Sequence, residues 1–101
     1  MVAPIPSRPT RRPRFLLGNC FATPGAMAAL QEAGQQAADF FHRHESGDWG
    51  EVGPDDRQAN EIAIRDGNRL MSVYRLSTGV KIWIITEADQ RATTILLPDE
   101  Y

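Results

Sequence analysis

The spacing of hydrophobic positions changes from a helical period to an alternating one near Arg69. Before that point apolar residues recur every three to four positions, and after it they alternate with polar ones, as in half-buried strands. The pattern therefore predicts an α+β fold with an N-terminal strand, two to three helices and then a three-stranded antiparallel meander, with the helices packed on one face of the sheet.

Residues that favour helix ends set the predicted helix boundaries. The first helix begins at Pro24 after the N-cap Thr23, and Gly34 can end it in the left-handed conformation. The second helix is predicted over residues 35–46. The third is predicted to begin at Pro54 and to end at Gly67.

Four stretches are predicted to be strands. The first covers residues 15–21, and in it Cys20 is interpreted as a packing residue. The others cover residues 69–76, 80–86 and 92–97, and short turns join these three.

Charge divides the chain of 101 residues into two parts. Residues 1–14 carry four arginines and no acid, whereas residues 15–101 carry seven basic against thirteen acidic residues, a net charge of −6. We predict a flexible arm rich in proline and arginine at 1–14 and a single α+β domain at 15–101. The arm either contacts nucleic acid or is a solvated tail, and its candidate contacts are Arg8, Arg11, Arg12 and Arg14.

The remaining composition predicts a cytoplasmic protein with no membrane contact. No apolar run has the eighteen or so residues that a membrane span needs, and no apolar stretch follows the first arginines as in a secretory signal. Cys20 is the single cysteine, so no internal disulfide can form.

The stretch "HRHESGDWGE" at 42–51 concentrates chemically active residue types. His42 and His44 point in roughly opposite directions on a helix and cannot hold one metal ion, so no metal site is predicted. His44 lies on the apolar stripe and is interpreted as a half-buried packing residue. Trp49 is either a buried structural corner, with Asp48 bonded to the local backbone, or a stacking platform beside a polar pocket.

A second candidate surface lies on the strand over residues 80–86. Alternation places Lys81 and Trp83 on one face with Glu87, and an aromatic side chain among charges is typical of binding surfaces. No catalytic motif is complete, since a phosphate-binding glycine loop and a nucleophile elbow are both missing. No catalytic residue and no cofactor are therefore predicted, and the candidate binding residues are Trp49, Lys81, Trp83, Glu87 and Arg91.

The segments "ATPGAMAAL", "GDWGEV" and "KIWIITEADQRATTILLPDEY" resemble a family of small proteins encoded on bacterial plasmids and integrative elements. The resemblance covers residues 15–101. It implies an accessory protein of a mobile element that has no agreed activity, and we interpret it as a non-enzymatic module that binds a host or plasmid-encoded protein.

The predicted element order is also similar to that of the RelE/ParE toxins, which cleave messenger RNA on the ribosome or block gyrase. That resemblance implies a toxin as the alternative function. The acidic domain departs from the basic surface of RNA-cleaving toxins. The residues that could hold RNA on the meander are Arg69, Tyr74, Arg75, Lys81 and Arg91.

Overall fold

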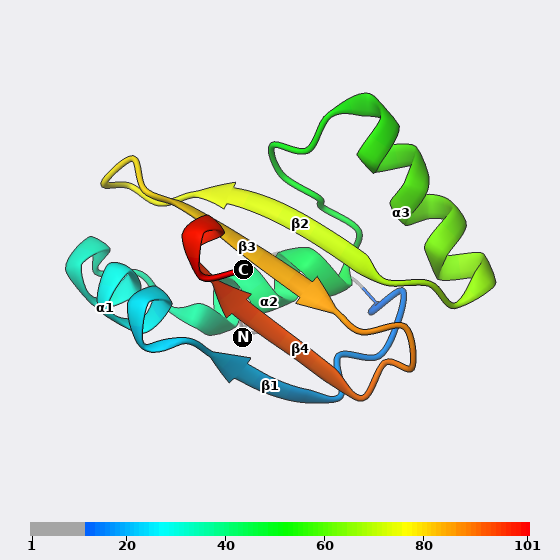
Figure 1. Cartoon of the computed structure of the whole chain (residues 1–101), viewed down its shortest axis with the longest axis horizontal. Coiled ribbons are helices and arrows are strands. Elements are labelled where there is room, and N and C mark those ends of the chain that lie inside the picture. Colours follow the sequence, from blue (N-terminus) through cyan, green and yellow to red (C-terminus); the bar gives the residue numbers. More distant parts are fainter. Residues whose placement is uncertain (1–11) are drawn as a thin grey trace, which may run out of the picture.

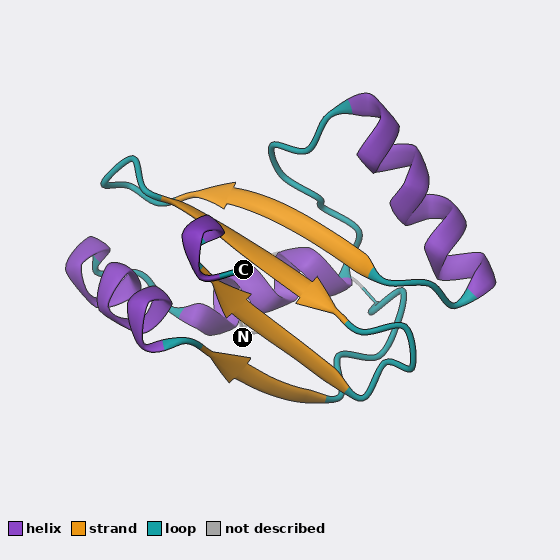
Figure 2. Cartoon of the chain, viewed as in Figure 1, coloured by secondary structure: helices purple, strands orange, loops and turns teal. Residues whose placement is uncertain are grey.

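The computed structural model describes residues 12–101, which form an α+β fold of three α-helices and a four-stranded sheet (Figures 1 and 2). In chain order the elements are β1 (Asn19–Ala22), α1 (Pro24–Ala33), α2 (Ala37–Glu45), α3 (Pro54–Asp66), β2 (Leu70–Arg75), β3 (Lys81–Thr86), β4 (Ala92–Leu96) and the short 3-10 helix η1 (Pro98–Glu100).

The sheet is mixed, with strand order β1-β4-β3-β2. Strands β2, β3 and β4 pair antiparallel in sequence order, as the meander requires. Strand β1 adds to β4 in parallel, with Asn19 opposite Ala92 and Ala22 opposite Ile95. The predicted meander is therefore only part of a larger mixed sheet.

The helices do not all lie on one face. Helix α2 lies behind the sheet in Figure 1 and α1 lies to the left of it, whereas α3 lies alongside β2, so the single-face prediction is wrong for α3. We call the face that α2 covers, and against which α1 also packs, the inner face. Its core cluster comprises Ala26, Leu30, Phe40, Tyr74, Leu76, Ile82, Ile84 and Ile95.

We call the opposite side of the sheet the outer face. Strand alternation and the pairing registers show which side chains of the four strands lie on this face. They are Asn19, Phe21, Met71, Val73, Arg75, Lys81, Trp83, Ile85, Ala92, Thr94 and Leu96. The C-terminal η1 lies in front of this face in Figure 1.

The predicted ends of α1 and α3 are confirmed, whereas α2 begins two residues later and ends one residue earlier than the predicted range 35–46. The Thr23 hydroxyl accepts the Ala26 N–H at 3.2 Å and so caps α1. Gly34 and Gly67 follow α1 and α3 with φ of 68° and 77°, a left-handed conformation that glycine adopts without steric cost.

The first strand begins four residues later than predicted. Gly18 has a φ of 66° and a Cβ there would meet the Arg91 backbone, so a glycine turns the chain before β1 docks on β4. Phe15 consequently leaves the sheet direction and packs in the core, while Leu16 is 70% exposed. Cys20 is exposed, so its interpretation as a packing residue is wrong.

Arg14 belongs to the folded domain rather than to the arm. Its guanidinium donates to both Glu61 carboxylate oxygens at 2.7 and 2.9 Å, and its N–H donates to the Glu45 carbonyl. Arg12 is exposed. The predicted contacts Arg8 and Arg11 lie outside the described residues.

The β2 edge of the sheet is closed by two devices. The Asn60 amide on α3 accepts the Met71 N–H at 3.1 Å and donates to the Met71 carbonyl at 2.7 Å, as a neighbouring strand would. The chain around Gly50 runs parallel to β2 and bonds to both main-chain groups of Val73. No further strand can pair at Met71 or Val73.

Candidate functional site

A chain of buried polar side chains runs across the inner face of the sheet. His44 of α2 contacts Ser72 of β2 through Nδ1 at 2.5 Å and Thr86 of β3 through Nε2 at 2.9 Å. Thr86 contacts Thr93 of β4 at 2.7 Å, and the Thr93 hydroxyl donates to the Leu17 carbonyl at 2.7 Å. The side chains of His44, Ser72, Thr86 and Thr93 are all 0% exposed, and we call them the His44 network.

The directions of the hydrogen bonds from Nε2 of His44 onward follow from the last acceptor, the Leu17 carbonyl. A carbonyl oxygen can only accept, so the single Thr93 proton goes to Leu17. Thr93 must then accept from Thr86, and Thr86 must accept from Nε2–H of His44. The network therefore requires a proton on Nε2 of His44, and in the neutral ring Nδ1 accepts from Ser72.

The environment of His44 favours the same neutral form. Burial lowers its pKa from 6.5 to about 3, and the rings of Phe15 and Trp49 lie edge-on to it at 5.0 and 5.8 Å. His44 was predicted to be half-buried, and the structure shows instead a fully buried, hydrogen-bonded side chain. Since Ser72 is buried with it, the Ser72–His44 pair offers no nucleophile to a substrate in this conformation.

Trp49 lies in the core between α2 and α3. It is 1% exposed, stacks on Phe15 with ring centroids 6.0 Å apart, and donates its indole N–H to Glu61 at 3.0 Å. Asp48 accepts the Gly50 N–H at 3.2 Å, as expected for a structural corner. This burial leaves the Trp49 ring no face on which a partner could stack, so it is not part of a binding surface.

The outer face carries a cluster of exposed aromatic and arginine side chains. Tyr101 is 65% exposed, and its ring meets the half-buried Trp83 ring edge-on at a centroid distance of 5.6 Å. Arg69 donates to the Tyr101 hydroxyl at 2.6 Å, and its guanidinium carbon lies 5.4 Å from the same ring centre. We call these three residues the Arg69–Trp83–Tyr101 cluster.

The other predicted binding residues lie at the two ends of β3 and just before β4. Lys81 is at the opposite end of β3 from Glu87, and its ammonium lies 3.8 Å from Glu51. Arg91 is exposed beside Asp89 at the turn before β4, so Lys81 and Arg91 lie at opposite ends of the antiparallel pair β3 and β4. The structure therefore groups Trp83 with Arg69 and Tyr101 rather than with Arg91.

The residues named for RNA contact do not converge on one site. Tyr74 faces the core at 1% exposure, donates to the Asp48 carbonyl at 2.5 Å, and has its pKa raised by burial. Arg75 and Lys81 are opposite each other on β2 and β3 and share the carboxylate of Glu51. Arg69 is at the other end of β2.

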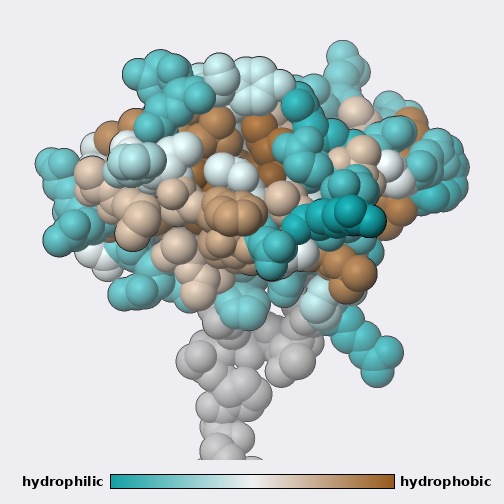
Figure 3. All heavy atoms as spheres, turned by 60° about the horizontal axis from the view of Figure 1, so that its bottom comes forward, coloured by the Kyte–Doolittle hydropathy of each residue, from teal (hydrophilic) through white to brown (hydrophobic). Residues whose placement is uncertain are grey.

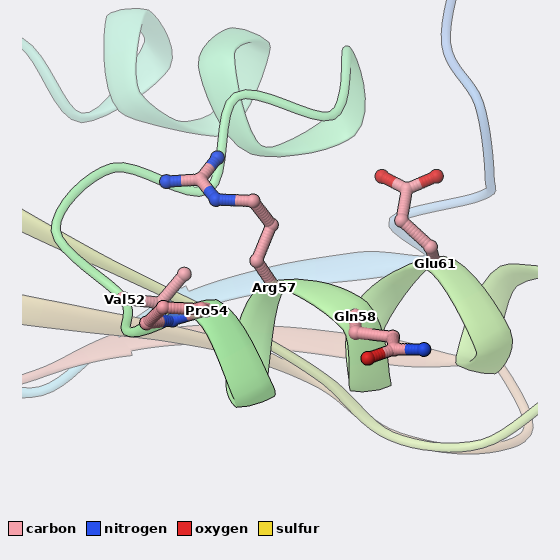
Figure 4. Close-up of a pocket in the computed structure, with 5 residues that line it drawn as sticks. All are labelled: Val52, Pro54, Arg57, Gln58 and Glu61. Carbon is pink, nitrogen blue, oxygen red and sulfur yellow. The ribbon is translucent and has the colours of Figure 1, made fainter.

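A shallow hollow of about 570 Å³ lies at the first two turns of α3 (Figure 4). Arg57 and Glu61 extend from the same side of the helix in that view, and Val52, Pro54 and Gln58 complete the lining. Hydrogen bonds from Arg14 and then Trp49 lower the pKa of Glu61 to about 2. Glu61 in this hollow is therefore already hydrogen-bonded to two other parts of the chain, Arg14 and Trp49.

In residues 12–101, no group of three or more His, Cys, Asp or Glu side chains is placed to hold a metal ion. No helix in the same range is long and apolar enough to cross a membrane.

Comparisons with protein-family models, with curated proteins and with solved structures gave no match to this chain. The resemblances to plasmid-related proteins and to RelE/ParE toxins therefore remain predictions from the sequence.

Sequence reasoning missed Tyr101, Asn60 and the three hydroxyls of the His44 network. The one signal for the hydroxyls was alternation, because Ser72, Thr86 and Thr93 all fall on positions that face the helices. Nothing in the local pattern marks Tyr101, whose contacts with Arg69 and Trp83 join distant parts of the chain.

Proposed function

We propose that the chain is a non-enzymatic accessory protein of a mobile genetic element that binds a host or plasmid-encoded protein through its outer face. The mobile-element origin rests on the family resemblance of residues 15–101. The observation that supports binding is the Arg69–Trp83–Tyr101 cluster, which stands on the sheet face opposite α1 and α2.

The three residue types in this cluster are those that contribute most to protein interfaces, because they combine a large apolar area with hydrogen-bonding capacity. Their mutual contacts also hold them in place before a partner arrives. Trp83 is fixed by β3, and Tyr101 is held between the Trp83 ring and the Arg69 guanidinium. Fixed side chains lose less conformational entropy on binding, so more of the contact energy is retained.

Charged residues surround the cluster and can form the rim of such an interface. Lys81 and Arg75 share Glu51 at one end of the outer face, and Glu87 follows β3 at the other end. Rim charges guide association and exclude unsuitable partners more than they add affinity.

The chemically active side chains of the domain are already committed to its folding. His44 and Tyr74 are buried and hydrogen-bonded within the core. Among the exposed bases, Arg75, Lys81 and Arg91 lie beside acids, at separate ends of the sheet. This distribution supports recognition of a protein surface more than cleavage of RNA.

The test combines expression in a bacterial host with site-specific crosslinking. We expect no growth arrest, and a photoreactive residue at Lys81 should crosslink a single protein that the same residue at Arg65 on α3 does not. Tyr101→Ala should weaken binding of the crosslinked protein (its capture) by about 30-fold. This corresponds to about 2 kcal/mol, which is typical of an interface hot spot. The control Ile62→Ala changes an exposed apolar residue of α3 and should leave capture unchanged.

Two results would contradict the proposal. Equal crosslinking from positions 81 and 65, or full capture by Tyr101→Ala, would remove the outer face as the binding surface. Growth arrest that is lost in Arg91→Ala would favour the toxin instead.

A further inference from the structure

The two edges of the sheet differ in how they are protected. The β2 edge is covered by Asn60 and by the chain around Gly50, whereas the β1 edge has no such cover within residues 12–101. An edge strand that is neither covered, charged nor interrupted by proline is a template for another strand. Strand β1 has the sequence NCFA, with no charge and no proline.

Hydrogen-bond alternation shows which main-chain groups of β1 point outward. Asn19 and Thr23 donate their N–H groups to the Arg91 and Ile95 carbonyls of the neighbouring strand. Groups of alternate residues point the same way, so the N–H and C=O of Cys20 and Ala22 point away from β4.

We infer that this edge pairs with β1 of a second copy of the same chain, in an antiparallel arrangement about a twofold axis at Phe21. In that register Cys20 of each copy is opposite Ala22 of the other. All four outward N–H groups of the two strands then meet the four outward C=O groups. The edge is self-complementary because its two outward-facing residues are placed symmetrically around Phe21.

Side chains near the axis fit a second copy as well. Phe21 is 53% exposed on the outer face, and the twofold places the two phenylalanine rings directly opposite each other. Leu16 at 70% and Met27 at 60% exposure lie beyond the two ends of β1, and an antiparallel pair brings the end of one strand beside the start of the other. Three of the six exposed large hydrophobic residues in the described chain thus gather at this edge.

The view in Figure 3 brings the β1 side forward and shows pale-brown to brown atoms gathered there, with teal atoms around them. The absence of charge from β1 means that two copies meet without opposing like charges, although residues 15–101 carry −6. A foreign strand would need an apolar centre of matching length, whereas a second copy supplies one by symmetry.

Closure of the β2 edge limits the assembly to two copies. Pairing at β1 produces one continuous eight-stranded sheet, and both of its outer edges are β2 edges covered at Met71 and Val73. The result is a closed dimer rather than a growing fibre. The outer faces with their Arg69–Trp83–Tyr101 clusters stay free, so this inference is independent of the proposed function.

Sedimentation velocity of the full chain, at concentrations from about 1 µM to about 1 mM, tests the assembly. The wild type should pass from monomer to dimer and not beyond. Ala22→Pro removes an outward N–H that β4 does not use, so it should raise the dissociation constant by about tenfold or more at unchanged melting temperature. Phe21→Lys should act in the same direction, and the control Val80→Lys, at the distant turn after β2, should not.

Oxidative crosslinking tests the register separately. In a Cys20→Ser background, Phe21→Cys should form a disulfide between copies, because residues in a non-hydrogen-bonded antiparallel pair have Cα atoms about 4.5 Å apart. Wild-type Cys20 should not crosslink, since the two Cys20 residues are diagonal and about 7–8 Å apart.

The inference is overturned if the wild type is monomeric at every concentration. It is also overturned if Ala22→Pro and Phe21→Lys dimerise like the wild type, or if Cys20 crosslinks more readily than Phe21→Cys. Binding of another protein that Ala22→Pro abolishes, with a monomeric wild type, would assign the edge to that partner.

Discussion

Lowering the pH should destabilise this protein through His44. Its pKa falls from 6.5 in the unfolded chain to about 3 in the folded one, so between these values the unfolded state binds a proton that the folded state excludes. Stability therefore decreases as the pH falls through 6.5 toward 3. Because pH 4 lies about 2.5 units below the pKa of the unfolded state, the free energy of unfolding at pH 4 should be about 3 kcal/mol lower than at pH 7.5.

The variant His44→Gln separates this effect from the titration of surface carboxylates. It should lose about 1–3 kcal/mol at pH 7.5, because the Ser72 hydroxyl or Thr86 loses a buried partner. Glutamine does not titrate, so between pH 7.5 and pH 4 the stability difference should move by about 3 kcal/mol in favour of His44→Gln, which closes or reverses the gap. Urea unfolding followed by tryptophan fluorescence at several pH values measures both quantities.

The second histidine supplies a matched control. The His42 side chain is 55% exposed near Glu45 and lies outside the His44 network, so His42→Gln is the matched substitution for His44→Gln. Parallel slopes for the wild type and His44→Gln would refute the reasoning, as would a His44 ring that titrates near pH 6.5 in a nuclear magnetic resonance experiment. The same spectra should show the proton on Nε2.

Three further substitutions test the corner and the covered edge by urea unfolding. Trp49→Ala should cost about 3–5 kcal/mol, as for other buried aromatics, whereas His42→Ala should cost less than about 0.5 kcal/mol; a wild-type midpoint for Trp49→Ala would contradict the corner. Asn60→Ala should cost about 1–3 kcal/mol, because the Met71 main chain loses both partners. Gly50→Ala should unfold more easily than Gly53→Ala, because a Cβ at Gly50 meets the Val73 carbonyl and Gly53 has open space.

Local signals predicted the elements that local interactions determine. The caps of α1 and α3 depend on residues within one helical turn, so Thr23, Gly34 and Gly67 could be read directly. Strand β3 was equally clear, because Ile82 and Ile84 alternate with Lys81 and Trp83. The turns between β2, β3 and β4 are short, which makes antiparallel pairing of neighbours the expected outcome.

Long-range contacts determine the features that local sequence patterns do not reveal, namely the position of Phe15, the pairing of β1 and the role of Asn60. The apolar run at Phe15 is typical of a strand, but its side chain is taken into the core by Trp49 and His44, and Gly18 turns the chain away. The parallel position of β1 depends on pairing residue 19 with residue 92, which no local pattern encodes. Asn60 looks like any polar residue of an exposed helix until the β2 edge is placed beside it.

The His44 network explains how β4, a strand with weak hydrophobic alternation, keeps its register in the sheet. Strand β4 has the sequence ATTIL, in which the two threonines give little preference for either face. A one-residue slip of β4 that brings Ala92 opposite Thr86 would turn Thr93 to the outer face, leaving Thr86 without its acceptor and the Leu17 carbonyl without its donor. Each orphaned buried group costs about 1–3 kcal/mol, a large fraction of the roughly 5–15 kcal/mol that stabilises a small domain. The network connects α2, β2, β3, β4 and the segment before β1 in a single chain of hydrogen bonds, and this slip breaks it. Polar groups that lower the hydrophobicity of the core thus select the native pairing over the register with Ala92 opposite Thr86.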